Sequence, residues 1–256
     1  MHVRRIHLPF TPAVGDIVTL PAAQAHYVSR VLRLKIGDAL ATFDGTGYES
    51  HLKLTIVSGT QVQGQVVFCT TRLGSTPPLR LILGQGLPHT SAKMDLIVEK
   101  CAELGLTTLV PLFTARTVVR EAPQRVATKL ARWRRIAAAA ARQCGRPVLL
   151  DIHPPQALTA FYAHYDTIPG KLLCWEDEPQ LGLRQALDHL PDCDAMAVLV
   201  GPEGGWTAQE VDQARAHGFL TISLGSHILR TETAAITITS LIRYSRGEFD
   251  PPNTPL

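Results

Sequence analysis

Cysteine is scarce and scattered in this chain of 256 residues. The five cysteines include no Cys-x-x-Cys pair, so neither a disulfide framework nor a structural zinc site is expected. Apolar runs stay shorter than the roughly 18 residues that cross a bilayer, and the first residues lack the apolar stretch that directs secretion. The sequence therefore predicts a cytoplasmic protein with no membrane segment and no bound metal.

An excess of one charge sign is also absent, because the formal net charge is only +3. The distribution is nevertheless uneven. Residues 80–146 hold twelve Lys and Arg against four Asp and Glu, whereas residues 147–256 hold six against fourteen. A basic surface favours a polyanionic partner, because Lys and Arg that contact phosphates release counterions and so add affinity. A basic helix face that contacts only solvent is the alternative interpretation.

Hydrophobic residues make up 45% of the chain, enough for a buried core that excludes overall disorder. Residues 1–72 contain short segments, several of which alternate apolar and polar residues, separated by glycine-bearing turns. They predict a small β-rich domain, a barrel or a sandwich. Residues 73–78 have the composition of a linker. The expected strands are 14–20, 39–43, 51–57 and 61–68, with a short helix near 22–32.

Beyond the linker, apolar runs of strand length alternate with segments of helix length. Continuous apolar strands are typical of a parallel sheet with helices on both faces, so residues 79–256 predict an α/β domain. The expected strands are 79–84, 107–112, 171–175, 195–200 and 219–224, and the expected helices are 91–104, 124–143, 180–189, 207–217 and 232–245.

The expected helix at 124–143 carries an apolar stripe with the period of a helix. Basic residues lie beside or opposite this stripe, which suggests an RNA-binding face. The helix dipole is the alternative explanation for basic residues near the end of the helix. The stripe consists of Val126, Leu130, Trp133, Ala137, Ala140 and Cys144, and the basic residues considered for RNA are Arg132, Arg135, Arg142 and Arg146.

Two glycine-bearing loops follow expected strands, at the edge where open α/β sheets bind ligands. The first is Gly201-Pro202-Glu203-Gly204-Gly205, after which Thr207 and Glu210 fit a capping box. The second begins at Leu224-Gly225. Neither loop matches a phosphate-binding motif, and Glu203 would repel a phosphate. S-adenosylmethionine (SAM) has ribose hydroxyls, a sulfonium and no phosphate, so it is compatible; a simple tight turn is the alternative.

Further motifs accompany the two loops along the chain. The residues concerned are Gly201–Gly205 with Glu210, Leu224-Gly225, Ile228–Ala234, Lys93-Met94-Asp95, Glu99-Lys100, Glu103–Gly105, Gln143-Cys144, Arg146, His26–Val28, Val31–Arg33, Gly37-Asp38 and Asp44-Gly45. Together these motifs resemble the RsmE family across essentially the whole chain. The two C-terminal loops carry the most specific part of the resemblance. The chain departs from the family pattern at Arg142 and His227, and residues 87–92 lack the usual Lys/Arg-Gly.

The resemblance implies a SPOUT-class methyltransferase that uses SAM to methylate N3 of a uridine in 16S ribosomal RNA of the small subunit. It implies an α/β domain with a trefoil knot, a PUA-like N-terminal β-barrel that binds RNA, and a homodimer. It also implies the cofactor-binding residues, which are Leu173, Cys174, Trp175, Leu199, Val200, Gly201, Pro202, Glu203, Gly204, Gly205, Leu224, Gly225, Ile228, Leu229, Arg230, Thr231, Thr233 and Ala234.

Methylation of uridine requires that N3 lose its proton. A carboxylate could accept that proton, and a guanidinium could stabilise the developing anion. We therefore predict Arg230 for the anion and Glu232 as base or orienting group, with Glu203 as the second candidate. A first-turn carboxylate favoured by the helix dipole is the alternative for Glu232. In the small domain, the predicted RNA-binding residues are Arg4, Arg5, Arg30, Arg33 and Lys35.

Two other functions remain open at the level of the sequence. One is a SPOUT methyltransferase that acts on a different RNA, such as tRNA or large-subunit ribosomal RNA. The other is a non-catalytic RNA-binding protein of ribosome assembly that keeps the fold. Binding of SAM would distinguish an enzyme from the non-catalytic protein.

Overall fold

The computed structural model describes residues 3–71, 79–117 and 123–250 and divides into two compact units. The first unit comprises Met1–Thr76 and Ala141–Leu149, and the second comprises Pro77–Ala140 and Leu150–Leu256. The predicted linker, 73–78, lies outside the described residues. The sequence had assigned 141–149 to the second domain, and this is wrong because that segment packs with the first unit.

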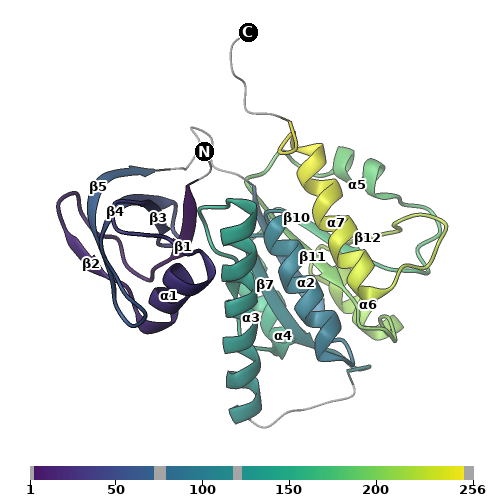
Figure 1. Ribbon diagram of the computed structural model, residues 1–256. Coiled ribbons are helices and arrows are strands. Elements are labelled where there is room, and N and C mark those ends of the chain that lie inside the picture. Colours follow the sequence, from purple (N-terminus) through teal and green to yellow (C-terminus); the bar gives the residue numbers. More distant parts are fainter. Residues whose placement is uncertain (1–2, 72–78, 118–122, 251–256) are drawn as a thin grey trace. The chain divides into compact units, whose positions relative to one another are not determined.

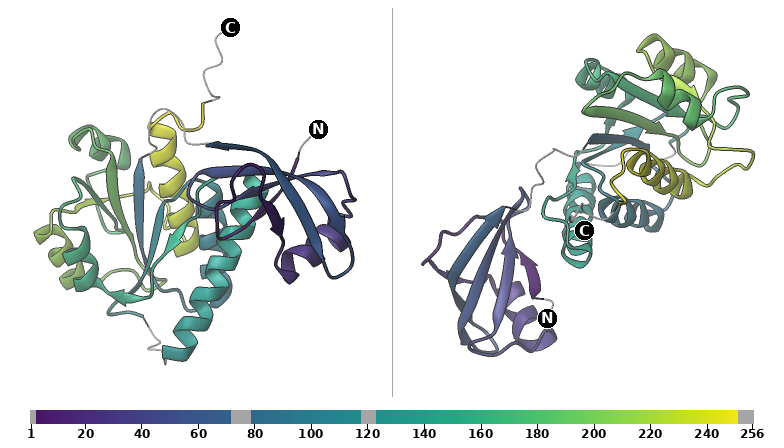
Figure 2. Two further views of the ribbon diagram at one scale, coloured as in Figure 1. Left: turned by 90° about the vertical axis from the view of Figure 1, so that its left-hand side faces the viewer. Right: turned by 90° about the horizontal axis from the view of Figure 1, so that it is seen from above.

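The first unit contains a five-stranded sheet in its described part. The strands are β1 (Arg4–His7), β2 (Ile17–Thr19), β3 (Ala39–Phe43), β4 (Tyr48–Val57) and β5 (Val62–Thr71), in the order β1-β3-β4-β5-β2. β1 pairs with β3 in parallel and the other pairs are antiparallel, with β4 and β5 forming a long hairpin (Figure 2). The predicted helix near 22–32 is split into α1 (Ala22–His26) and the π-helix η1 (Tyr27–Val31).

The turn between β3 and β4 explains why residues 141–149 join this unit. The Asp44 carboxylate accepts hydrogen bonds from the backbone and hydroxyl of Thr46, both at 2.8 Å. The turn then accepts the later segment, because the Leu149 amide donates to the Gly45 carbonyl at 2.9 Å. A Cβ on Gly45 would lie 2.7 Å from Leu149 Cγ, so only glycine allows this close approach.

The second unit is built on a parallel sheet, as predicted. Its strands in the described residues run in the order β12-β10-β11-β6-β7-β8, with β9 also beside β7, and every pair is parallel. The strands are β6 (Arg80–Gly86), β7 (Thr108–Phe113), β8 (Asp151–Ile152), β9 (Gln156–Ala157), β10 (Gly170–Cys174), β11 (Ala195–Val200) and β12 (Leu220–Ile222).

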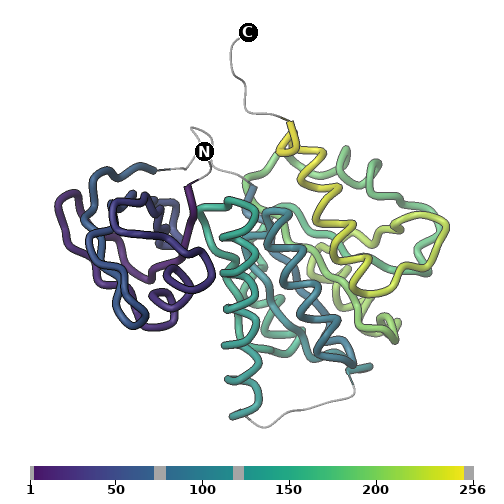
Figure 3. Tube along the Cα trace, in the orientation of Figure 1, coloured from purple at the N-terminus to yellow at the C-terminus, as the bar shows by residue number. Residues whose placement is uncertain are grey.

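Helices cover both faces of this sheet. The α2, α3 and α7 helices lie together over one face (Figure 1), and α7 runs beside α2 near the C-terminal end of the chain (Figure 3). The side chains of α4 and α6 pack in the core of the other face. The helices are α2 (Ser91–Glu103), α3 (Pro123–Cys144), α4 (Leu158–Tyr165), α5 (Leu183–His189), α6 (Ala208–Ala216) and α7 (Thr231–Ser245).

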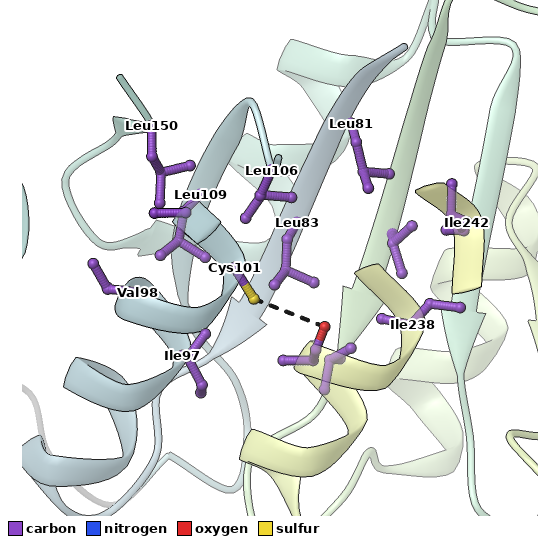
Figure 4. Close-up of a cluster of buried hydrophobic side chains, with 14 of the residues drawn as sticks. Leu81, Leu83, Ile97, Val98, Cys101, Leu106, Leu109, Leu150, Ile238 and Ile242 are labelled. Atoms are coloured by element: carbon purple, nitrogen blue, oxygen red, sulfur yellow. Dashed lines mark hydrogen bonds between the residues drawn. The ribbon is translucent and has the colours of Figure 1, made fainter. Parts of the chain in front are cut away.

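The central strand β11 shows why its sequence is apolar throughout. Met196, Val198 and Val200 point into the core beneath α2 and α7, whereas Ala197 and Leu199 point into the core beneath α4 and α6. The first core is shown in Figure 4, where Cys101 of α2 lies against α7. Alternating side chains on a strand face opposite sides, so a strand covered on both faces carries no polar side.

The apolar stripe of α3 is confirmed in its middle and wrong at its end. Trp133, Ala137 and Ala140 are buried, and Trp133 is only 2% exposed. Cys144 is exposed, so the buried stripe stops about one turn earlier than predicted. No helix of the described residues is long and apolar enough to span a membrane.

Candidate active site

The first glycine-bearing loop turns sharply after β11 and is held by three local contacts. Thr207 caps α6 through the predicted capping box with Glu210, which the structure confirms. The Gly205 amide donates to the Pro202 carbonyl at 2.9 Å, and Gly205 has φ +69°, which favours glycine. The Trp206 indole donates to the Cys174 carbonyl at 3.0 Å, so the loop is fixed against the end of β10.

The second loop follows β12 and leads into α7. The Ser223 amide donates to the Leu181 carbonyl at 2.8 Å, and Gly225 has φ +115°. At the start of α7, the Thr231 hydroxyl donates to the Gly201 carbonyl at 2.6 Å. The two loops therefore meet at the carboxyl edge of the sheet, as the sequence predicted.

A cavity of about 330 Å³ lies between the two loops. Most of the predicted cofactor-binding residues line it. Among the exceptions, Leu173 and Leu199 point into the core on the other face of the sheet, Gly204 turns its carbonyl to Arg116, and Thr233 is exposed on α7. The predicted residues on the wall are Cys174, Trp175, Val200, Gly201, Pro202, Glu203, Gly205, Leu224, Gly225, Ile228, Leu229, Arg230, Thr231 and Ala234.

Sequence reasoning missed five other residues on the wall. They are Lys93, Glu176, Ser223, Ser226 and His227. Lys93 stands in a motif that resembles the family, which was a usable signal. Glu176 lies just beyond the end of β10, and this position after a predicted strand was a second usable signal. Its carboxylate lies over Gly205, where a Cβ would collide with it.

Lys93 joins the two candidate carboxylates. Its ammonium lies 2.9 Å from Glu203 Oε1 and 3.7 Å from Glu232 Oε2. The His89 amide at the entrance to α2 also approaches both Glu203 oxygens, at 3.1 and 3.2 Å. Burial alone would raise the pKa of Glu203, but the hydrogen bonds from Lys93 and His89 have the larger, opposite effect, so the pKa of Glu203 lies below its ordinary value. Glu203 is therefore ionised at neutral pH, and its oxygens already accept hydrogen bonds.

Glu232 differs from Glu203 because its Oε2 accepts no hydrogen bond from the described residues and has the Lys93 ammonium only at 3.7 Å. The residue is buried. Arg230 stands at the N-cap position of the same helix and lies exposed at the cavity wall. Burial raises the pKa of the Cys174 thiol on the cavity wall to about 12, so this thiol stays protonated at neutral pH and is a poor nucleophile.

Several predicted RNA-binding residues are exposed in the first unit. Arg5 is the exception, and its prediction as an RNA-binding residue is corrected here. Its guanidinium pairs with Glu49 at 2.9 Å and stacks over Phe43, with only 10% of the side chain exposed, so it stabilises the sheet instead of facing RNA. The exposed residues are Arg4, Arg30, Arg33 and Lys35.

The predicted RNA-binding residues of α3, and Arg146 just beyond it, fall into different environments. Arg135 is exposed, whereas Arg132 makes a two-pronged contact with Asp95, the closest distance being 2.7 Å. Arg142 stacks over the ring of Tyr27, 4.5 Å from its centre, and Arg146 is half-buried. Within the described residues, no group of three or more His, Cys, Asp or Glu side chains could hold a metal ion.

Known proteins are similar to this chain in sequence and in fold. Residues 75–243 match the RNA methyltransferase domain family. The chain is 37% identical to a Synechocystis protein named ribosomal RNA small subunit methyltransferase E, over 85% of this chain and 69% of that protein. It is 30% identical to the Bacillus subtilis protein of the same name, over 88% of this chain and 89% of that protein.

Two solved structures resemble the whole chain. One, from Legionella pneumophila, is described as a methyltransferase in complex with SAM and has a TM-score of 0.86 at 30% identity, covering 96% of this chain and 98% of that one. The other is ribosomal RNA small subunit methyltransferase E from Neisseria gonorrhoeae bound to SAM, with a TM-score of 0.82 at 30% identity over 95% and 98%. Fold and pocket thus define an RNA methyltransferase. The chain belongs to the ribosomal RNA small subunit methyltransferase E family.

Proposed function

We propose that this protein transfers the methyl group of SAM to N3 of a uridine in 16S ribosomal RNA. One observation carries the proposal: two glycine-bearing loops meet around a 330 Å³ cavity whose wall holds Lys93, Glu203 and Arg230. Glu232 lies within 3.7 Å of that lysine. Reacting groups and a cofactor-sized space are thus adjacent.

The residues of the cavity fit SAM. The positive φ of Gly205 and Gly225 brings main chain to the wall, where amides and carbonyls can contact adenine and ribose. Glu176 is an exposed carboxylate on the same wall, which suits hydroxyls or positive charge and disfavours phosphate. When bound, SAM would supply an electrophilic methyl on a sulfonium. We propose that the loop residues and the strand ends near Trp175 hold it.

The protein's own residues then control the uridine proton. We propose that Glu232 accepts the proton from N3, because its Oε2 accepts no hydrogen bond from the described residues and has Lys93 only at 3.7 Å, whereas Glu203 already accepts bonds from Lys93 and His89. The electron pair left on N3 forms the new N–C bond while the methyl–sulfur bond breaks. Arg230 would stabilise negative charge on the uracil oxygens.

The chain also carries surfaces suited to ribosomal RNA. We propose that residues 1–72 form a PUA-like barrel and that Arg30, Arg33 and Lys35 in it contact phosphates. The five-stranded sheet and the exposure of these side chains support this. On α3, exposed Arg135 is the strongest candidate. Ribosomal RNA as the substrate implies action in the cytoplasm on the small subunit or its RNA.

We further propose the SPOUT knot and a homodimer. Two features support the knot: β12 pairs with β10 instead of with β11, which precedes it along the chain, and a bridge joins Gly182 to Ser223 across the segments that follow these strands. Exposed apolar side chains near α7 support a second copy of the chain as partner. They are Ile228, 85% exposed, Leu241, 42% exposed, and Tyr244, 69% exposed.

The decisive test maps methyl groups in 16S ribosomal RNA from a deletion strain and from the strain complemented with this protein. One uridine N3 methyl should disappear and then return. Methyl on tRNA or large-subunit RNA instead would identify the other enzyme, and absence of SAM binding by calorimetry would favour a non-catalytic protein. Glu232→Gln and Arg230→Ala should each lower turnover at saturating cofactor. Near-wild-type turnover in both would refute their roles.

The RNA surface has a separate test. Neutralising Arg30, Arg33 and Lys35 to glutamine should reduce the slope of log affinity against log salt by roughly 2, because each lost phosphate contact removes about 0.7 for single-stranded nucleic acid. Arg184→Gln, an exposed residue of the acidic half, is the control. An unchanged slope in the triple variant would remove this face from RNA binding.

A further inference from the structure

Gln85 is a polar residue at a position where the fold otherwise requires apolar ones. It is the penultimate residue of β6 and is fully buried, with 0% exposure. Its backbone pairs with Val200 on one side and Pro111 on the other. Leu83 and Leu81, two and four residues earlier on the same face of the strand, both belong to the apolar core. The carboxamide therefore needs an explanation that packing does not give.

The amide nitrogen of Gln85 contacts both cofactor loops. It donates to the Gly86 carbonyl and to the Thr231 hydroxyl, each at 2.8 Å, and also lies 3.4 Å from the Gly201 carbonyl. Thr231 passes the connection on, because its hydroxyl donates to the Gly201 carbonyl at 2.6 Å. A carboxamide has two N–H hydrogens, and the two short bonds use both.

These bonds form a relay across three distant parts of the chain. It runs from the end of β6, through the first residue of α7, to the loop after β11. Gly201 and Thr231 both line the cavity, whereas Gln85 stands behind them. Buried hydrogen bonds in series strengthen one another and fix one arrangement of the groups they join. The relay thus sets the separation and orientation of the two loops.

The relay has a cost that a purely structural glutamine would not justify. Gln85 Oε1 is buried and has no donor among the described residues. An unsatisfied buried acceptor is unfavourable, and a methionine of similar length would avoid it. The two carbonyls and the hydroxyl around the nitrogen fix which way the amide points, because only N–H can face acceptors. The benefit must therefore come from the contacts of the nitrogen.

We propose that Gln85 is a positioning residue for the cofactor site, which holds the two glycine-bearing loops in their binding arrangement through Thr231 and Gly201. This inference rests on the proposed function, since it assigns Gln85 to the same pocket. Gln85 does not touch the cofactor. It acts on the affinity of the pocket through the two wall residues that it joins.

The test measures SAM binding by titration calorimetry and loop opening by amide hydrogen exchange, both on the full chain. Gln85→Met should weaken SAM binding by about tenfold or more, the usual effect of losing bonds among buried groups. It should also speed exchange at 201–205 and 224–231 without cofactor. Thr231→Val should behave alike, and Thr231→Ser, which keeps the hydroxyl, should restore most of the affinity. Leu83→Ala, a core change on the same strand face, should lower the melting temperature but leave affinity within about twofold.

A double-variant cycle separates positioning from general destabilisation. If Gln85 acts through Thr231, Gln85→Met should have little further effect on affinity in the Thr231→Val background. Two results would overturn the inference. One is a Gln85→Met variant with wild-type SAM affinity and wild-type exchange rates. The other is a loss of SAM affinity in Gln85→Met no larger than in Leu83→Ala when the two variants have equal stability. If Thr231→Val folds and Gln85→Met does not, the comparison of SAM affinity between Thr231→Val and Thr231→Ser tests the inference by itself. Absence of SAM binding in the wild type would instead refute the proposed function, and the exchange data would still judge the relay.

Discussion

Gly86, the last residue of β6, offers a sharp test of how closely the first cofactor loop packs on the sheet. A Cβ added there would lie 2.5 Å from Pro202 Cδ and 2.6 Å from Pro202 N. Ordinary contacts begin near 3.4 Å, so Gly86→Ala must displace the loop by about 1 Å, because part of what it meets is backbone that cannot rotate away. Overpacking of this kind costs about 1–3 kcal/mol.

The expected result is a loss of SAM affinity that exceeds the loss of stability. A displacement of about 1 Å in a binding site can change function by about a hundredfold, whereas the unfolding free energy should fall by no more than about 3 kcal/mol. Titration calorimetry and urea denaturation measure the two effects on the same samples.

Two other glycines serve as matched controls. Gly84→Ala, on the same strand, would meet side chains of Leu199, Leu112 and Phe161 in the core, so it should lower stability with a smaller effect on affinity. A Cβ on Gly182 would have nothing within 4 Å, and its φ of −86° suits any residue, so Gly182→Ala should leave affinity unchanged and cost less than about 1 kcal/mol as an N-cap change on α5. Unchanged SAM affinity in Gly86→Ala would refute the close packing of Pro202 on β6.

Two further predictions concern charge. The pKa of Glu203 is lowered in the folded protein, so its ionised form adds stability above its ordinary pKa, and this stability is lost as pH falls through the lowered value. The difference in unfolding free energy between wild type and Glu203→Gln should therefore shrink between pH 7 and pH 3. A constant difference would contradict the pairing with Lys93. Glu248→Ala would leave Arg243, whose side chain is 2% exposed, without its ion partner, and the unfolding free energy measured in urea should fall by about 3 kcal/mol. Asp192→Ala is the control, because it removes from Arg246 a partner that is 96% exposed, and it should lower the unfolding free energy by less than about 1 kcal/mol.

Local patterns predicted most elements of the second unit. The expected strands 195–200 and 107–112 correspond to β11 and β7, and the capping box at Thr207 forms as expected. These features depend on residues close together in the chain, so periodicity and capping chemistry suffice. The loops after β11 and β12 were located for the same reason, since each follows a recognisable strand and contains glycine.

Elements that depend on distant partners were missed. β1 has the polar sequence Arg-Arg-Ile-His and exists because it pairs with β3. The short α4 was not predicted, although it fills the core beneath the sheet with Phe161 and Tyr165. Arg5 was assigned to RNA because its sequence neighbours gave no sign of Glu49, which is 44 residues away and pairs with it.

By itself the sequence determined where most strands and helices of the second unit and the glycine turns occur, and which family motifs they carry, because those signals lie within a few consecutive residues. Only the tertiary structure decided that Lys93 would lie between Glu203 and Glu232, that Glu176 would face Gly205, and that Gln85 would join both loops. The partners in each of these contacts are separated by 29 or more positions in the printed sequence. The physical reason is that a side chain's hydrogen-bond and ionic partners are chosen by how the chain folds back on itself, and composition and periodicity carry no information about that.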